Sequence, residues 1–169
     1  MISHPQISSN HRKALKVKPK HKVAVLLPCA GTKPFPESPS HKHGYLPALK
    51  GKKADVYVVS EPLGVVPYEW SDTYPNNAYD FPPQYLRGRA FDLLVKRVGE
   101  WLDSVGKKYD KLVLALPAHH MKLVKAALKG RDLVVVDAGV SVCKDEGTCG
   151  PNVYRATHGS YSTWLRRKV

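Results

Sequence analysis

The alternation of apolar and polar runs along this chain predicts a sheet whose strands are separated by helices. Four short runs, rich in branched apolar residues, have the length of buried strands: Lys22–Leu27, Ala54–Ser60, Leu112–Leu116 and Leu133–Val136. In two longer segments, Gln84–Val105 and Ala118–Leu128, apolar residues recur at steps of three and four, the pattern of an amphipathic helix. This order favours an α/β fold in three layers, α/β/α, around a mostly parallel sheet of four strands.

Proline-rich loops follow the first two predicted strands, and both carry reactive side chains. The segment 28–41 contains four prolines and offers a thiol, an ammonium, hydroxyls, a carboxylate and an imidazole. The segment 61–67 follows the second strand and begins with Glu61. Because the carboxyl ends of parallel strands meet at one edge of a sheet, where open α/β folds bind ligands, we expect the two loops to form one site.

Four residues of these loops are candidates for catalysis: Cys29, Lys33, His41 and Glu61. Cys29 is either a small buried residue or a nucleophile whose pKa is lowered by Lys33 and His41. Lys33 is either a solvated charge or a clamp for a phosphate or carboxylate, and His41 is a ligand contact or general acid. Glu61 suits the role of a base or of an amine-binding group.

Further residues at the same edge are candidates for substrate binding: Pro28, Ser38, Ser40, Gly64, Tyr68, Trp70 and Asp137. The two serines also suit turn and cap positions, and Gly64 suits a turn. The aromatic residues Tyr68, Trp70, Tyr74 and Tyr79 form either a satellite core under a long loop or a platform on which a base stacks. The residues alone leave both interpretations open.

The charge of the chain adds a polyanionic partner to this picture. The 169 residues carry a formal net charge of +13, and the first 22 residues hold six basic side chains and no acidic one. We therefore expect a basic, partly disordered arm over 1–21, followed by a single α/β domain over 22–169. Nucleic acid is the natural partner, although a generally basic protein has the same composition. Candidate RNA contacts are Arg12, Lys13 and Lys16 in the arm, and Lys122, Lys125 and Lys129, which also suit a solvated helix face.

Several classes of protein are disfavoured by the sequence. No apolar run approaches the roughly 18 residues of a membrane span, and residues 1–5 begin no secretory signal, so we expect a cytoplasmic protein without a membrane partner. Cys143 and Cys149 lack the spacing of a zinc site, and their redox state is open. We expect no metal and no cofactor.

The loop motif resembles a known family. The pattern Pro28-Cys29-x3-Lys33-Pro34-Phe35-x2-Ser38-x2-His41 is similar to the Pro-Cys-x3-Lys-Pro-Tyr-x2-Ser-x2-His signature of archaeosine synthase, an archaeal tRNA-modifying paralogue of tRNA-guanine transglycosylase. The block from Glu61 to Trp70 is similar to the second block of that family. The likeness spans about Val23 to Val136, the catalytic core, whose α/β arrangement is similar to that of uracil-DNA glycosylases. Phe35 departs from the motif, because it lacks the hydroxyl of tyrosine.

The resemblance implies a reaction and partners. An amine, in the family that of free lysine, adds to the nitrile of 7-cyano-7-deazaguanine in tRNA, and a radical-SAM enzyme completes archaeosine. Cys29 would form a thioimidate, Lys33 or His41 would protonate the nitrile nitrogen, and Glu61 would bind or deprotonate the amine. The chain lacks the transglycosylase-like region and PUA domain of full-length members, so either its basic arm and positive charge replace their tRNA contacts or a partner subunit carries them. The alternatives are a non-catalytic tRNA-binding subunit and a glycosylase-like enzyme acting on a flipped base.

Overall fold

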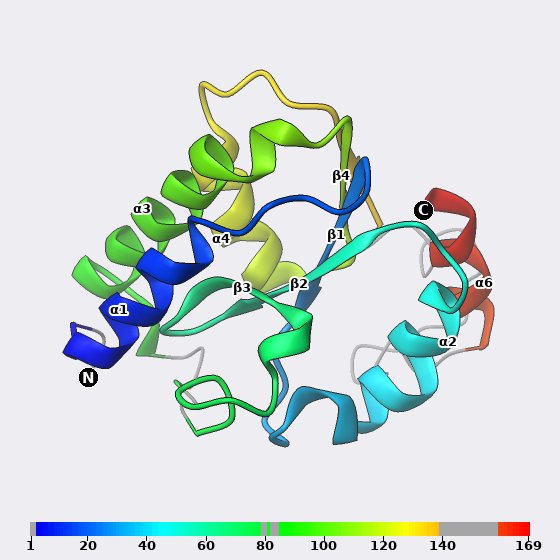
Figure 1. Cartoon of the computed structure of the whole chain (residues 1–169), viewed down its shortest axis with the longest axis horizontal. Helices are drawn as coiled ribbons and strands as arrows, with labels where there is room; N and C mark the ends of the chain where they lie inside the picture. Colours follow the sequence, from blue (N-terminus) through cyan, green and yellow to red (C-terminus); the bar gives the residue numbers. More distant parts are fainter. Residues whose placement is uncertain (1–2, 79–80, 82–84, 139–158) are drawn as a thin grey trace.

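The computed structural model describes residues 3–78, 81, 85–138 and 159–169, and its centre is a five-stranded sheet (Figure 1). The strands are β1 (Val23–Pro28), β2 (Asp55–Ser60), β3 (Gly64–Pro67), β4 (Lys111–Leu114) and β5 (Val135–Asp137), in the order β3-β2-β1-β4-β5. β1 pairs in parallel with β2 and β4, β4 pairs in parallel with β5, and β3 runs antiparallel to β2. The fold is thus α/β with a mostly parallel sheet, and the expected number of four strands is wrong.

The additional strand is β3, which lies in a segment that the sequence predicts to be a loop. Its first residue, Gly64, pairs with Ser60, so only residues 61–63 connect β2 to β3. Gly64 has a φ of 89°, a left-handed conformation that suits the end of a three-residue hairpin loop. β3 is an edge strand, where Pro67 at its end is tolerated because one side of an edge strand makes no ladder hydrogen bonds. Pro62 before this strand and Pro67 at its end are residues typical of loops, so the sequence pattern does not predict a strand here.

The described helices surround this sheet. They are α1 (Pro5–Ala14), α2 (Leu46–Leu49), α3 (Arg89–Ser104), α4 (Ala118–Leu128) and α6 (Gly159–Lys168), with single turns η1 (Phe35–Glu37), η2 (His41–Tyr45), η3 (Tyr68–Trp70) and η5 (Gly106–Lys108). The prediction for α4 is confirmed at both ends. α3 starts at Arg89 rather than Gln84, because Gly88 before it has a φ of 54° and interrupts the helical backbone.

Apolar side chains fill both faces of the sheet. On one face, alternate residues of the strands such as Leu26 and Tyr57 pack against α3 and α4, with Trp101 fully buried at the centre. On the other face, Val25 and Leu27 pack against α2 and α6 (Figure 1). This alternation follows from the period of two in a strand. The two packed faces hold the strand ends, and hence the loops that follow them, in fixed positions.

The segment 1–21, expected to be a partly disordered arm, contains helix α1. Ile7 and Ala14 on this helix have no exposed surface, and Nε2 of His11 lies 2.7 Å from the Glu100 carboxylate on α3. α1 therefore packs beside β3 and α3, while its basic residue Lys13 faces solvent. The residues that follow α1 are also held, because backbone N–H groups of residues 20 and 21 donate to the Asp55 carboxylate.

Within the described ranges, no helix combines the length and the hydropathy that crossing a membrane requires. Three residues singled out from the sequence, Tyr79, Cys143 and Cys149, lie outside the described residues.

Candidate active site

The ends of three parallel strands converge at the carboxyl edge of the sheet. Cys29 follows β1, Glu61 follows β2, and His120 lies in the first turn of α4, just after β4. The strand order places β2 and β4 on opposite sides of β1, so the sheet is extended in opposite directions from β1. Open α/β sheets bind their ligands at such a switch point. The expectation that the loops after the first two strands meet is confirmed for Cys29 and Glu61.

These three side chains are in direct contact. The Cys29 thiol donates a hydrogen bond of 3.2 Å to Oε2 of Glu61, and its Sγ lies 3.6 Å from Nε2 of His120. That Nε2 is 3.1 Å from each oxygen of the Glu61 carboxylate. Glu61 is 1% exposed and His120 is 2% exposed, while Cys29 is partly exposed. A nucleophile, a carboxylate and an imidazole thus share one small, mostly buried volume, the arrangement used to activate a thiol.

The electrostatics of the cluster reverse one expectation from the sequence. Burial raises the pKa of the Cys29 thiol far above its usual value, and the negative charge of Glu61 raises it further, against a smaller lowering by Lys33. The expected lowering of this pKa is therefore wrong, and the resting sulfur is a protonated thiol. Burial also raises the pKa of Glu61, but the hydrogen bond and charge of His120, with the hydrogen bond from Cys29, outweigh it and leave that pKa lowered. Glu61 is accordingly an ionised acceptor.

His41 is fully buried and lies behind the loop, where both of its ring nitrogens are engaged. Nε2 is 2.9 Å from the carbonyl oxygen of Pro28, which can only accept, so Nε2 carries the proton. Nδ1 then accepts from the hydroxyl of Tyr68 at 3.0 Å, and the two rings stack. Burial lowers the pKa of His41 to about 4. A neutral imidazole with two partners fixes the residue before Cys29, which is a positioning role.

Lys33 folds back onto its own loop. Its Nζ donates to the carbonyl oxygen of Ala30 and lies 4.3 Å from the centroid of the Phe35 ring. Phe35, where the resembling motif has tyrosine, is fully buried and stacks against His41. The ring at this position therefore packs the loop and faces the lysine, two roles that need no hydroxyl.

The other expected substrate-binding residues divide between the loop and more distant places. Ser38 accepts from the backbone N–H of His41 at 3.4 Å and Ser40 lies beside it, so both support the turn into η2. Gly64 begins β3 close to Arg97 and His11 rather than to Cys29. Trp70 closes η3 and is partly exposed.

Asp137 and the basic candidates lie along two helices and one strand end. Asp137 ends β5, and its carboxylate lies 3.1 Å from Nζ of Lys125. The candidate RNA contacts are exposed on or just after α1 and α4: Arg12, Lys13, Lys16, Lys122, Lys125 and Lys129. Nζ of Lys122 also lies 5.8 Å from the centroid of the Phe91 ring. The two helices thus present basic side chains to solvent.

The sequence pattern does not predict two residues of the site. It places His120 in an amphipathic helix, although this residue stands just after a predicted strand, the same signal that identifies Cys29 and Glu61. Arg97 lies on α3, is buried, and donates to the carbonyl oxygen of Pro62, which fixes the residue after Glu61. No sequence signal marks that contact, because a helical arginine is ordinarily solvated.

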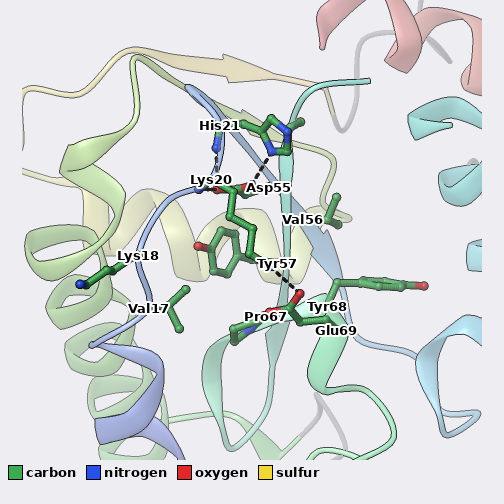
Figure 2. A pocket seen from close by; sticks show the side chains of 11 residues that line it. Val17, Lys18, Lys20, His21, Asp55, Val56, Tyr57, Pro67, Tyr68 and Glu69 are labelled. Atoms are coloured by element: carbon green, nitrogen blue, oxygen red, sulfur yellow. Dashed lines mark hydrogen bonds and ion pairs between the residues drawn. The ribbon is translucent and has the colours of Figure 1, made fainter. Parts of the chain in front are cut away.

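A separate pocket of about 320 Å³ lies at the opposite end of β2 (Figure 2). Lys20 crosses it, with Nζ 3.0 Å from the Glu69 carboxylate, and Asp55 lies at its rim beside His21. Its walls include the start of β2 and the end of β3, whereas the reactive cluster follows the end of β2. The pocket is therefore distinct from the candidate active site.

Comparisons with known proteins place this geometry among relatives. A family described as a domain of unknown function (DUF5591) matches residues 9–152. The chain is 33% identical over 104 residues to the archaeosine synthase subunit alpha of Thermoplasma acidophilum, a match that covers 60% of this chain and 20% of that protein. It is 43% identical over 56 residues to the archaeosine synthase of Haloferax volcanii, covering 33% of this chain and 9% of that protein. The matched stretches are thus a small part of both relatives.

One solved structure shares the fold. The crystal structure of AF0587, a protein of unknown function, superposes with a TM-score of 0.65 at 18% sequence identity, covering 94% of this chain and 48% of that chain. At this identity the likeness extends to the fold alone.

Proposed function

We propose that this chain, which belongs to the DUF5591 family, acts in archaeosine modification of tRNA by adding an amine to the nitrile of 7-cyano-7-deazaguanine. The names of the matched relatives support a role in this modification. The observation that carries the catalytic part is the contact of the Cys29 thiol with both Glu61 and His120. A tRNA-presenting subunit would have no need of a buried nucleophile, acceptor and imidazole in contact.

The first step forms a thioimidate. As the sulfur of Cys29 attacks the nitrile carbon, its proton moves to Glu61, and the imidazole of His120 delivers a proton to the nitrile nitrogen. One bond of the nitrile breaks while the carbon–sulfur bond forms. Glu61 returns its proton to His120. The raised pKa of Cys29 makes this transfer necessary, because the resting thiol does not ionise by itself.

The second step releases the product. The amine, which we take to be that of free lysine, attacks the thioimidate carbon, and Glu61 accepts the proton that the amine loses. The carbon–sulfur bond then breaks, and the sulfur recovers this proton as Cys29 returns to the thiol. The sum is nitrile plus amine giving an amidine, which requires no oxidant and no nucleotide because a nitrile is already electrophilic.

The tRNA is a fitting partner for the charge of the chain. Phosphates would lie along the exposed basic residues of α1 and α4, and Tyr68, whose hydroxyl contacts His41 of the loop, and Trp70 in the same turn would contact the modified base. Because the chain matches a small part of its relatives, we propose that a transglycosylase-like or PUA-containing region supplies further tRNA contacts. A radical-SAM enzyme would act on the product.

The test follows the modified nucleoside. tRNA carrying 7-cyano-7-deazaguanine is incubated with the protein and free lysine, digested, and analysed by mass spectrometry. We expect a lysine adduct with the unaltered chain and with Cys149→Ser, and none with Cys29→Ser. Intact-protein mass spectrometry without lysine should detect the tRNA base trapped on Cys29. A chain that binds the tRNA but forms neither species is a binding subunit, and full adduct formation by Cys29→Ser would eliminate the covalent step.

A further inference from the structure

The three side chains of the candidate active site also have the composition of a metal centre. We propose that Cys29, Glu61 and His120 bind one zinc ion, with a fourth coordination position left for water or a substrate group. Their ligand atoms all lie within 4.8 Å of one another, and they are the one such group among the described residues. The prediction of no metal from the sequence is based on the cysteines and His41, without His120.

The distances between the ligand atoms fit a tetrahedral zinc ion. Zinc bonds of about 2.3 Å to sulfur and about 2.0–2.2 Å to nitrogen and oxygen place neighbouring ligands roughly 3.3–3.6 Å apart. In this structure Sγ is 3.6 Å from Nε2 of His120 and 3.2 Å from Oε2 of Glu61, and Nε2 is 3.1 Å from the carboxylate. The ligands would therefore move apart by only a few tenths of an ångström around the ion. The backbone that positions them needs no rearrangement.

The charges and the buried polar atoms favour the same occupant. A thiolate from Cys29 and the carboxylate of Glu61 carry two negative charges, which a divalent cation neutralises where burial penalises an unbalanced charge. Among the described residues, Oε1 of Glu61 accepts no hydrogen bond, although Nε2 of His120 lies 3.1 Å away, and Nδ1 of His120 is buried with no hydrogen-bond partner. Nε2 is the ring nitrogen that faces Sγ and the carboxylate, so it would bind the ion with the ring proton on Nδ1, and the ion would replace its contact with Glu61.

The ligand set selects the kind of metal. Thiolate and imidazole are soft or borderline ligands that suit Zn²⁺, whereas Mg²⁺ and Ca²⁺ require sites built from oxygen. Three protein ligands and one open position are also the pattern of accessible zinc sites rather than closed structural ones. Binding displaces the proton of the Cys29 thiol into solvent, so affinity falls as the pH falls.

If the proposed function holds, zinc at this site also controls the reaction. A sulfur coordinated to zinc is withheld from the nitrile, so the metal-bound chain is the inactive form of the covalent enzyme. Zinc would then control the availability of Cys29, and a chelator would release it. The binding itself does not depend on the identity of the substrate.

Cobalt titration tests the site directly. Co²⁺ is added to the metal-free chain, and the near-ultraviolet thiolate-to-cobalt charge-transfer band and the visible bands of tetrahedral Co²⁺ are recorded. We expect one Co²⁺ per chain, displaced by Zn²⁺. Cys29→Ser should abolish the charge-transfer band, and Glu61→Gln, which keeps the volume of the side chain, should weaken binding. The matched controls are His119→Gln, next to His120 but outside the cluster, and the double variant Cys143→Ser/Cys149→Ser, both of which should keep the full spectrum.

The outcomes are separable from those of the proposed function. The metal site is overturned if the unaltered chain shows no tetrahedral bands or if the thiolate band survives Cys29→Ser. Circular dichroism of Cys29→Ser establishes that this variant is folded. Alkylation of Cys29 by iodoacetamide should slow on adding Zn²⁺ and recover with EDTA; equal rates would overturn the control of the thiol. Adduct formation on tRNA is measured in EDTA, so it succeeds or fails whether or not the metal binds.

Discussion

The docking of helix α1 can be tested by removing one side chain from its buried face. Ile7 has no exposed surface and packs in a small cluster with Phe35, Val58, Leu63 and Val66. Ile7→Ala deletes three carbon atoms, worth about 0.8 kcal/mol each by transfer from water, and the cavity that remains adds to this loss. We therefore expect the free energy of unfolding to fall by about 3 kcal/mol, within the roughly 2–5 kcal/mol found for such changes.

Urea denaturation followed by tryptophan fluorescence measures this loss. With a slope of roughly 2 kcal/mol per molar urea, a loss of about 3 kcal/mol lowers the midpoint by about 1.5 M. Lys13→Ala on the exposed face of the same helix is the control, and its midpoint should correspond to a change within about 0.5 kcal/mol. If Ile7→Ala unfolds at the midpoint of the unaltered chain, α1 is not docked, and residues 1–21 are the mobile arm that their composition suggests.

Three other changes probe the site and its support. Glu61→Gln should speed the alkylation of Cys29 at neutral pH, since the carboxylate that helps to raise the thiol pKa is removed; an unchanged pH–rate profile would show that burial alone sets it. Tyr68→Phe removes the hydrogen bond to Nδ1 of His41 and should cost about 1 kcal/mol in urea unfolding, whereas no change would mean that this bond adds nothing to stability. Burial raises the pKa of Asp55, but hydrogen bonds from the backbone and from the side chains of His21 and Tyr109 outweigh it and lower that pKa. The stability from Asp55 is therefore present above its unfolded pKa of about 3.9 and lost as the pH falls through the lower folded value. Asp55→Asn should lower the melting temperature at pH 7 and converge with the unaltered chain in acid; a constant difference at all pH values would contradict this.

The sequence predicts a strand or a helix correctly where a single apolar pattern extends over the whole segment. β1, β2, β4 and α4 follow directly from runs of apolar residues, because strands buried on both faces are continuous apolar runs and α4 repeats at helical spacing. α1 is different, since its buried positions Ile7 and Ala14 stand among polar and basic residues whose pattern resembles a solvated segment. That helix is held by contacts with β3 and α3, which only the tertiary structure reveals.

The site illustrates the same limit at the level of chemistry. The meeting of Cys29 with Glu61 follows from the rule that parallel strands end at one edge, so it can be deduced from two strand predictions. The sign of the shift in the Cys29 pKa cannot, because it depends first on how deeply the sulfur is buried and then on which charge lies nearest to it. In the sequence Lys33 is the near neighbour, whereas in the structure the Glu61 carboxylate is in contact and Lys33 is turned toward Ala30 and Phe35.

The central position of β1 in the sheet brings the three reactive side chains together. Glu61 and His120 reach Cys29 from the strands on either side of β1, so the thiol contacts an acceptor and an imidazole that the chain separates by 59 positions. A thiol kept protonated beside an ionised carboxylate is slow to react with adventitious electrophiles, because the thiolate is the reactive form. It becomes a nucleophile when the nitrile of a bound substrate draws the sulfur forward and Glu61 accepts the proton, and it becomes a metal ligand when a cation replaces that proton. Substrate and metal both require the loss of one proton from Cys29, and they compete for its sulfur. The rate of Cys29 alkylation with and without Zn²⁺ therefore measures how much of that sulfur is available to react.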